Sequence, residues 1–341
     1  MRNTTNYLWF LLCLILFNVQ CSEKESFPVL RGDYLGQNPP GTTPELFAPG
    51  IVTTRHHEHS APAFSPDGNE VFWSAFLAPL QSKAPQVILY SKLENGKWTK
   101  PEVAPFSGQY PEGGPCFSYD GNKLFYGSRR PADGKGEPKD WDIWFVERLS
   151  NGWSEPKNPG APINSEKSEG QPTITKDGTL YFLSDHKDYQ YENCIFRSRF
   201  LNGRYEKPEP LSEPINIKGS YSWCPFIAPD ESYMLFVSNR EGGLGWGDIY
   251  VSYRGADDSW TEPKNLGAPI CSDDNDRFPK VSPDGKVLFF ASKRTSIGAY
   301  YTEPQSFNEL MAQYANPGNG LTDIYWVSVK IIEELKPDEL K

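Results

Sequence analysis

The stretch from Ser220 to Pro263 decides the fold, and it reads S-Y-S-W-C-P-F-I-A-P-D-E-S-Y-M-L-F-V-S-N-R-E-G-G-L-G-W-G-D-I-Y-V-S-Y-R-G-A-D-D-S-W-T-E-P. Four short runs of aromatic and β-branched residues are separated there by turn-forming Pro, Asp and Gly. This pattern is typical of four antiparallel strands. The same four-part unit recurs along the chain, so the sequence predicts a protein built from repeats.

The turn between the first and second runs marks each repeat. Asp accepts hydrogen bonds from the backbone that follows it and Gly adopts positive φ, so an S-P-D-G sequence suits a tight hairpin. The marker aspartates stand 53 to 57 residues apart, at Asp67, Asp120, Asp177, Asp230 and Asp284. A period of about fifty residues with four strands per unit is typical of a β-propeller blade. The sequence therefore predicts an all-β protein, a single propeller of five four-stranded antiparallel blades. Six blades is the alternative, should the C-terminal end contain a degenerate blade.

The outermost strand of a unit has its own marker, an aromatic residue followed three positions later by Pro. Four copies follow a first strand, at Trp98, Trp153, Tyr205 and Trp260, so one blade lacks its outer strand. The missing strand is found near the N-terminus, where residues 43–51 (T-P-E-L-F-A-P-G-I) resemble residues 262–270 (E-P-K-N-L-G-A-P-I). We therefore expect the N-terminal strand to complete the last blade and to leave the ring without an open edge.

The S-P-D-G turns, the strand L-F-V-S-N-R and the strand D-I-Y-V-S together resemble the WD40-like repeats of TolB-type and tricorn-type propellers. The resemblance covers about residues 43–330 and implies that residues 41–330 form the propeller. It implies little about function, because propellers serve as scaffolds, ligand binders and enzymes.

The N-terminal segment is predicted to be a targeting signal. Arg2 precedes an apolar run at residues 8–17 that is too short to span a bilayer, so residues 1–20 read as a signal peptide. Cys21 follows at once, as at a bacterial lipoprotein processing site, although Gln20 stands where a small residue is usual. We expect lipidation of Cys21 and a bacterial cell-envelope location, with residues 21–40 as a tether and 331–341 as a C-terminal tail. Ordinary cleavage near Cys21 and secretion is the alternative.

Charge and motifs exclude several classes of function. The formal net charge is −10 and no Lys/Arg cluster occurs, which argues against a nucleic-acid partner. No Gly-rich phosphate loop, C-x-x-C pair or G-x-S-x-G elbow is present, and no cofactor is expected. Ring closure leaves no sheet edge to share, so a monomer is expected.

The residues just before the recurring Pro of each first strand are expected to gather at one mouth of the channel. They differ between blades: His59-Ser60-Ala61, Glu112-Gly113-Gly114, Glu169-Gly170-Gln171, Ser222-Trp223-Cys224 and Asp276-Arg277-Phe278. Unlike polar groups in one concavity indicate a ligand site. The alternative is that these are solvated rim residues or partners in hydrogen bonds between blades.

Two functions are compatible with this mouth. The first is binding of an envelope protein or glycan through His59, Tyr221, Trp223, Arg277 and His186. The second is a carbohydrate-active enzyme, in which Glu112, Glu169 and Asp276 supply the carboxylates of glycoside hydrolysis. A lyase with a His or Tyr base and Arg277 is a variant of the second.

An insertion at residues 295–321 contains Tyr300, Tyr301 and a helical pattern over 307–314. We expect it to emerge on the same face, as a lid or a sugar-stacking platform, unless it is decoration. His57, His59 and His186 are weak metal candidates, but their spacing matches no zinc motif, and no metal site is predicted.

A further pattern concerns arginines at the ends of second strands. Blades with Arg130, Arg240 or Arg294 also have an aspartate at the start of the third strand, at Asp142, Asp248 and Asp323. Blades without the arginine lack the aspartate, so the sequence predicts an Arg–Asp pair within each of these blades.

Overall fold

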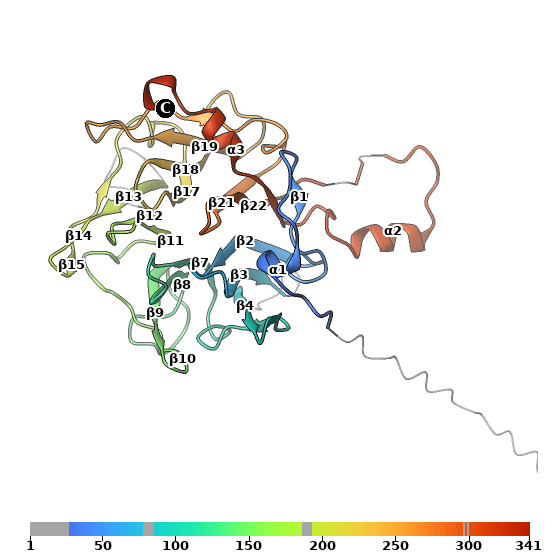
Figure 1. The fold of residues 1–341 in the computed structure, drawn as a ribbon, viewed down its shortest axis with the longest axis horizontal. Helices are drawn as coiled ribbons and strands as arrows, with labels where there is room; N and C mark the ends of the chain where they lie inside the picture. Colours follow the sequence, from blue (N-terminus) through green and yellow to red (C-terminus); the bar gives the residue numbers. More distant parts are fainter. Residues whose placement is uncertain (1–26, 78–84, 186–192, 296, 299) are drawn as a thin grey trace, which may run out of the picture.

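The computed structural model describes residues 27–341 apart from 78–84, 186–192, 296 and 299. Five antiparallel sheets stand around a central channel, and the first strand of each sheet lies next to the channel (Figure 1). The described residues thus form the predicted all-β propeller with five four-stranded blades rather than six.

The blades follow one another along the chain. Blade one contains β2 (His57–Phe64), β3 (Glu70–Phe76) and β4 (Val87–Glu94), and its outer edge is divided between β5 (Lys97–Trp98) and β6 (Glu102–Val103). Blade two contains β7 (Glu112–Phe117), β8 (Lys123–Ser128), β9 (Asp142–Leu149) and β10 (Gly152–Trp153). Blade three contains β11 (Glu169–Ile174), β12 (Leu180–Ser184), β13 (Cys194–Ser198) and β16 (Glu209–Pro210), with the hairpin β14 (Phe200–Leu201) and β15 (Arg204–Tyr205). Blade four contains β17 (Ser222–Ile227), β18 (Tyr233–Ser238), β19 (Asp248–Tyr253) and β20 (Lys264–Asn265).

Blade five is built from both ends of the chain. It contains β21 (Asp276–Val281), β22 (Val287–Ser292) and β23 (Asp323–Ser328), and its outer strand is β1 (Glu45–Leu46). In the antiparallel register of β1 and β23, Glu45 lies opposite Trp326. The predicted closure of the ring by the N-terminal strand is therefore confirmed.

The marker aspartates stabilise the hairpins as expected from their chemistry. Asp120 accepts hydrogen bonds from Ser118 Oγ at 2.6 Å and from the backbone N–H of Asn122 at 3.0 Å. Asp67 and Asp284 make the same two kinds of bond in their own turns. Each carboxylate thus closes its turn from the inside, which explains why the marker recurs.

Aromatic residues fill the space between neighbouring sheets. Phe47 lies at the junction of blades five and one, with its ring 4.9 Å from Phe289 and 5.1 Å from Trp326. Phe64 of blade one stacks on Phe289 at 5.6 Å. Phe47 and Trp326 are almost fully buried, so the closing segment is part of the core.

Residues on either side of the predicted propeller boundaries also pack against it. In α1 (Asp33–Gly36), Tyr34 and Leu35 are buried, and the Tyr34 hydroxyl donates to Asp284 at 2.6 Å. In α3 (Lys330–Glu334), Ile332 is buried and its carbonyl accepts a hydrogen bond from the Tyr253 hydroxyl. A short 3-10 helix, Asp338–Leu340, ends the chain.

The helix α2 (Phe307–Tyr314) forms within the insertion of blade five. Its capping box joins Ser306 and Glu309: the Glu309 N–H donates to Ser306 Oγ, and Glu309 Oε2 accepts from the Ser306 N–H. Throughout the part of the chain that the structure describes, no helix has the length and apolar character needed to cross a membrane.

Candidate functional site

The channel narrows at one layer of residues. In blades two to five the first strand shifts register at the same place, as between Gly113 and Cys116 in blade two. The bulge residues have positive φ angles of 65° at Gly114, 54° at Gln171, 49° at Cys224 and 52° at Phe278. For the three that are not Gly, this left-handed conformation costs about 1–2 kcal/mol each. We call these four residues the waist.

The waist brings side chains of different blades together. The Phe278 ring lies 5.0 Å from the His59 ring, and a Cβ added to Gly114 would lie 3.9 Å from Phe278 Cε1. Gln171 Oε1 accepts a hydrogen bond from the Cys224 N–H at 2.7 Å. Two cavities lie on either side of this layer, of about 370 and about 360 Å³, and no described residue lines both.

The cavity on the side where the first strands begin is the predicted mouth, and we call it the mouth cavity. Its volume is about 360 Å³. Blades one to three supply most of its wall, and Phe278 of blade five closes its inner end. Its polar or aromatic lining residues are His59, Gln86, Trp141, Ser168, Glu169, Gln171, Asp185, Asn193 and Phe278.

Gln86 and His59 form the polar side of this cavity in blade one. Gln86 Nε2 lies 3.1 Å from His59 Nδ1 and donates to Ser74 Oγ at 3.2 Å. Burial lowers the pKa of His59 well below its ordinary value, as does the charge of Arg277, so the ring is neutral at neutral pH. Because Nδ1 then accepts from Gln86, the His59 proton lies on Nε2, where it is available as a donor.

Glycines make room for these side chains. A Cβ at Gly113 would lie 2.0 Å from Gln86 Nε2, and one at Gly127 would lie 3.3 Å from Trp141 Cε3. A side chain at Gly113 of blade two would therefore displace Gln86 of blade one, and a side chain at Gly127 would press on Trp141 within blade two.

The three carboxylates predicted as catalytic are not gathered in one place. Glu112, Glu169 and Asp276 are each at most 1% exposed, and of the three only Glu169 lines the mouth cavity. Each accepts from the backbone N–H four residues earlier: Gly108 at 3.2 Å, Ser165 at 3.0 Å and Ser272 at 2.6 Å. The repetition indicates that these carboxylates hold the loop that enters each blade.

Glu58 occupies the same structural position in blade one, although His59 aligns with Glu112 when the recurring Pro is used as the reference. Its Oε1 accepts from Thr54 Oγ1, also four residues earlier, at 2.7 Å. The offset arises because β2 shifts register between Glu58 and Ser60. Burial raises the pKa of Glu58 to about 8, and burial also raises the pKa of Glu112 and of Glu169.

The predicted Arg–Asp pairs do not form. Arg240 donates to the carbonyls of Pro214 at 3.2 Å and Ile215 at 2.9 Å, and Asp248 accepts from the Leu244 N–H at 2.7 Å. The guanidinium lies over the Phe236 and Tyr250 rings at 5.0 and 5.1 Å, which directs it toward the preceding loop.

The other two arginines behave alike, and their carboxylate partner is the one at the start of the first strand. Arg130 lies 3.3 Å from Glu112, and Arg294 lies 2.9 Å from Asp276. Asp142 accepts instead from Asn158 at 2.8 Å, and Asp323 from the Gly318 N–H at 2.7 Å. The arginines are structural, as expected, but the prediction of their partners was wrong.

Of the described residues that were predicted to bind ligand, only His59 lines the mouth cavity. Arg277 Nη2 is instead engaged by Thr322 Oγ1 at 3.2 Å and lies 3.4 Å from His57 Nε2. Trp223 is 9% exposed and packs against Trp246, with the rings 5.4 Å apart. The Tyr221 N–H donates to Asn239 Oδ1 at 2.8 Å.

The insertion of blade five does not cover the channel. Tyr300 and Tyr301 precede α2, and α2 lies beside the ring when the molecule is viewed along the channel (Figure 1). Tyr301 donates to Gln313 at 2.9 Å within the insertion, and Tyr300 is 81% exposed. The expected lid over the mouth is therefore not the arrangement that the structure adopts.

Two predicted residues, His186 and Cys21, lie outside the described residues. The His57 and His59 rings are 6.0 Å apart, and burial lowers the pKa of His57 to about 4. Within the described ranges, no group of three His, Cys, Asp or Glu side chains could hold a metal ion.

Sequence reasoning missed Gln86, Trp141 and Asn193. All three lie directly before a third strand, β4, β9 or β13. Gly247 and Thr322 hold this position in blades four and five. The position varies from blade to blade, and that variation is the signal that could have identified it.

Comparisons with known proteins describe the fold. No protein-family model matches the sequence, and no curated protein matches it. Similar solved structures include TolB from Acinetobacter baumannii, at 17% identity and a TM-score of 0.44, covering 79% of this chain and 56% of that chain. An α-L-arabinofuranosidase from Lactobacillus brevis has 12% identity and a TM-score of 0.46, covering 81% of this chain and 91% of that one. A gluconolactonase from Xanthomonas campestris has 13% identity and a TM-score of 0.45, covering 80% and 84%. Similarity at this level transfers no activity.

Proposed function

We propose that this protein is a recognition protein of the bacterial cell envelope that binds an uncharged glycan segment in the mouth cavity. One observation carries the proposal: amide, imidazole and indole groups from three blades converge on a concavity of about 360 Å³. An aromatic wall with a few placed polar groups is typical of small-ligand sites. Trp141 offers a flat face for a sugar ring, while Gln86, Gln171 and Asn193 offer amides for its hydroxyls.

The charge of the cavity favours a neutral ligand over a uronic acid. Glu169 and Asp185 line it, and neither Arg nor Lys is among its described lining residues. Arg277, which a lyase would need beside the substrate carboxylate, is engaged by Thr322 and lies outside this lining. A negatively charged sugar would meet like charge here.

Binding without turnover is favoured because the buried carboxylates have structural partners. Glu112 and Asp276 each hold a loop and face an arginine. A pair of carboxylates on the two sides of a bond, as glycoside hydrolysis requires, is therefore not supplied by the three predicted residues.

A glycoside-cleaving enzyme is the second candidate, and one observation favours it. Glu169 lines the cavity and burial raises its pKa, as suits a general acid, while the Asp185 carboxylate lines the same cavity. Incubation with neutral oligosaccharides followed by mass spectrometry distinguishes the two. A product that disappears in the Glu169→Gln variant would establish the enzyme.

The envelope location is part of the proposal and is supported by the sequence alone. Cys21 stands directly after the predicted signal peptide, where lipid attachment would tether the propeller to a membrane. Mass spectrometry of the membrane-bound protein should find the lipid on Cys21. A Cys21→Ser variant should leave the membrane fraction; if it stays there unchanged, the anchor is not Cys21.

The binding proposal is tested with protein carrying Cys21→Ser, screened against neutral oligosaccharides and then titrated calorimetrically. Trp141→Ala should weaken binding by about tenfold or more, because a stacked aromatic wall is lost. Trp246→Ala is the matched control: Trp246 is 60% exposed and lies outside the lining. An equal loss of affinity in both variants would contradict the proposal that the ligand binds in the mouth cavity. Capture of an envelope protein in place of a glycan would contradict the proposed class of ligand.

A further inference from the structure

The second cavity lies at the other end of the channel, where the hairpins between first and second strands turn, and we call it the hairpin-end cavity. Its volume is about 370 Å³. The residue after the recurring Pro of each first strand forms one ring around it: Ala63, Cys116, Thr173, Phe226 and Lys280. Four members are uncharged, and Lys280 alone departs from the repeat. Ring geometry does not require a charge here, since four blades do without one.

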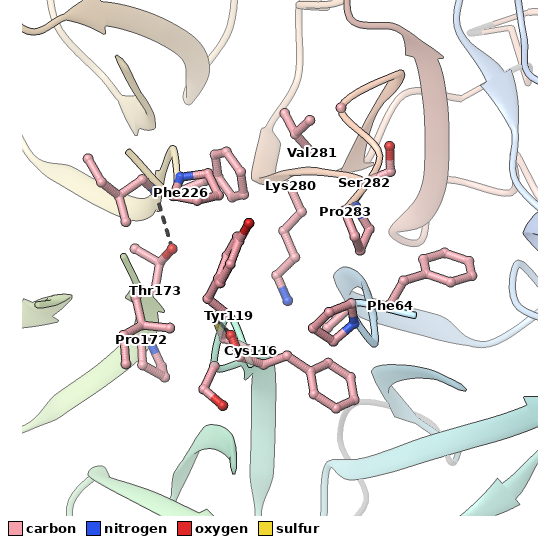
Figure 2. Close-up of a pocket in the computed structure, with 18 of the residues that line it drawn as sticks. Phe64, Cys116, Tyr119, Pro172, Thr173, Phe226, Lys280, Val281, Ser282 and Pro283 are labelled. Carbon is pink, nitrogen blue, oxygen red and sulfur yellow. Dashed lines mark hydrogen bonds between the residues drawn. The ribbon is translucent and has the colours of Figure 1, made fainter. Parts of the chain in front are cut away.

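Lys280 points into this cavity. Figure 2 shows its side chain extended from blade five toward the space between Tyr119 and Phe64. Its Nζ donates to the Pro115 carbonyl of blade two, which accounts for one of its three N–H donors. Within the described residues Lys280 has no ion pair, and it is the only lining residue with a charge.

Among the described residues no carboxylate lines this cavity, and a second cation, Lys176 Nζ, lies 5.3 Å from the centre of the Tyr119 ring. Burial raises the pKa of the Cys116 thiol above its ordinary value, and burial raises the pKa of the Cys224 thiol to about 12. The phenols of Tyr119 and Tyr233 line the same cavity, and Arg277 stands three residues earlier on β21. Asp284, in the hairpin after β21, is not in the lining and accepts from Tyr34 and Ser282.

A cation held in this way lacks a counter-charge. Burial lowers the pKa of Lys280 to about 8, so the ammonium form still predominates at neutral pH although desolvation disfavours it. A bound anion would supply the negative charge that Lys280 lacks. It would also accept hydrogen bonds from the two N–H groups of the ammonium that the Pro115 carbonyl does not use.

The side chains that line the hairpin-end cavity indicate which chemical groups the ligand has besides its negative charge. Phe226, Tyr119 and the prolines Pro62, Pro172 and Pro225 present apolar surface around the ammonium. A single cation without an arginine fork matches one negative charge better than the two charges of a phosphate. The apolar wall gains most from burying a ring or a short hydrocarbon.

We propose that the hairpin-end cavity is a binding site for a small monocarboxylate with an apolar body, whose carboxylate pairs with Lys280 and whose body packs between Phe226 and Tyr119. This site is separate from the mouth cavity, because the waist lies between the two cavities and they have no lining residue in common among those that the structure describes.

The test compares an acid with its neutral amide. Titration calorimetry near neutral pH with 3-phenylpropionate and 3-phenylpropionamide should show the acid binding more tightly by about tenfold or more, as expected for a charge-assisted contact. Lys280→Met should abolish the difference between acid and amide. Lys286→Met is the matched control, because Lys286 lies in the same hairpin, is exposed and pairs with Asp284 at 3.0 Å, and this variant should retain the difference.

Two controls are needed: one shows that Lys280→Met is folded, and the other shows that the mouth cavity does not contribute to carboxylate binding. Circular dichroism melting should show that Lys280→Met is folded, since the variant removes a buried charge. Trp141→Ala should keep full carboxylate binding, so failure of this site and failure of the glycan site are distinguishable. Absence of 3-phenylpropionate binding at about 10 mM would overturn the proposal. Equal binding of acid and amide, retention of the difference in Lys280→Met, or inorganic phosphate competing as well as the acid would also overturn it.

Discussion

The rings of Phe278 in blade five and His59 in the neighbouring blade one lie 5.0 Å apart. This contact places a side chain of the last blade at the inner end of a cavity built mainly by the first three. It also helps to separate that cavity from the one that contains Lys280. Two chemically different spaces, one polar and acidic and one apolar with a single cation, therefore occupy one channel.

Phe278 is predicted to stabilise the waist despite its left-handed backbone. Phe278→Ala should lower the free energy of unfolding by about 3 kcal/mol, because a buried ring is lost. Phe278→Gly should be no less stable than Phe278→Ala, since Gly relieves the strain at φ 52°. Urea unfolding of the three proteins measures both effects. A Gly variant that is about 1 kcal/mol less stable than the Ala variant would show that the backbone there is not strained.

Glu58 is predicted to oppose folding at neutral pH. Burial raises its pKa to about 8, and its Oε2 has no hydrogen-bond partner among the described residues. The folded state thus holds a proton that the unfolded state releases near pH 4, so the stability contributed by Glu58 falls as pH rises from about 4 to about 8. Glu58→Gln should raise the free energy of unfolding at neutral pH by about 1 kcal/mol or more and flatten this dependence. Unfolding midpoints measured at several pH values provide the check, and a less stable Gln variant at neutral pH would contradict it.

Lys280 should give the opposite pH dependence. Its pKa is lowered to about 8 when folded, so between about pH 8 and pH 10 the unfolded state binds the proton that the folded state has lost. The stability contributed by Lys280 therefore rises with pH across that interval, and Lys280→Met should remove this rise. Comparing the two proteins at pH values on either side of 8 measures it. An identical pH profile in both would show that the Lys280 pKa is close to its ordinary value.

The marker aspartates should each contribute modestly to stability. Asp120→Ala removes the acceptor for Ser118 and Asn122 and should cost about 1 kcal/mol. These hydrogen bonds, to Ser118 first, lower the pKa of Asp120, so the contribution is present above about pH 4 and is lost as pH falls further. Chemical unfolding of the variant at neutral and acidic pH is the measurement. Asp133→Ala is a suitable control, because Asp133 lies in a loop and not in a marker turn. An equal effect of the two substitutions would contradict a special role for the marker.

The fold was predictable because its signals are local and repeated. The marker aspartates gave the number of blades, and the likeness of residues 43–51 to 262–270 predicted that β1 would pair with β23. The closing strand was visible in the sequence because an edge Pro and its aromatic neighbour recur at fixed spacing.

The site was harder to predict because it depends on register and direction. A bulge shifts Glu58 into the position that the Pro-based alignment assigned to His59. Arg277 directly precedes the register shift in β21, at the position where a side chain was expected to reach the channel mouth. Its guanidinium turns toward Thr322 instead. Gln86 and Trp141 lie at the ends of loops of unequal length, where no fixed spacing points to the channel. Nothing in the sequence could show that Gly113 leaves room for Gln86.

The most direct test of the central claim is a crystal structure of the protein with the neutral oligosaccharide that binds best in the screen. We predict a sugar ring on the face of Trp141, with its hydroxyls within hydrogen-bond distance of Gln86 and Asn193 and no broken glycosidic bond. A sugar bound elsewhere on the propeller, with the mouth cavity unchanged, would contradict the proposed site. A cleaved sugar beside Glu169 would show that the protein is a glycoside-cleaving enzyme and not a recognition protein.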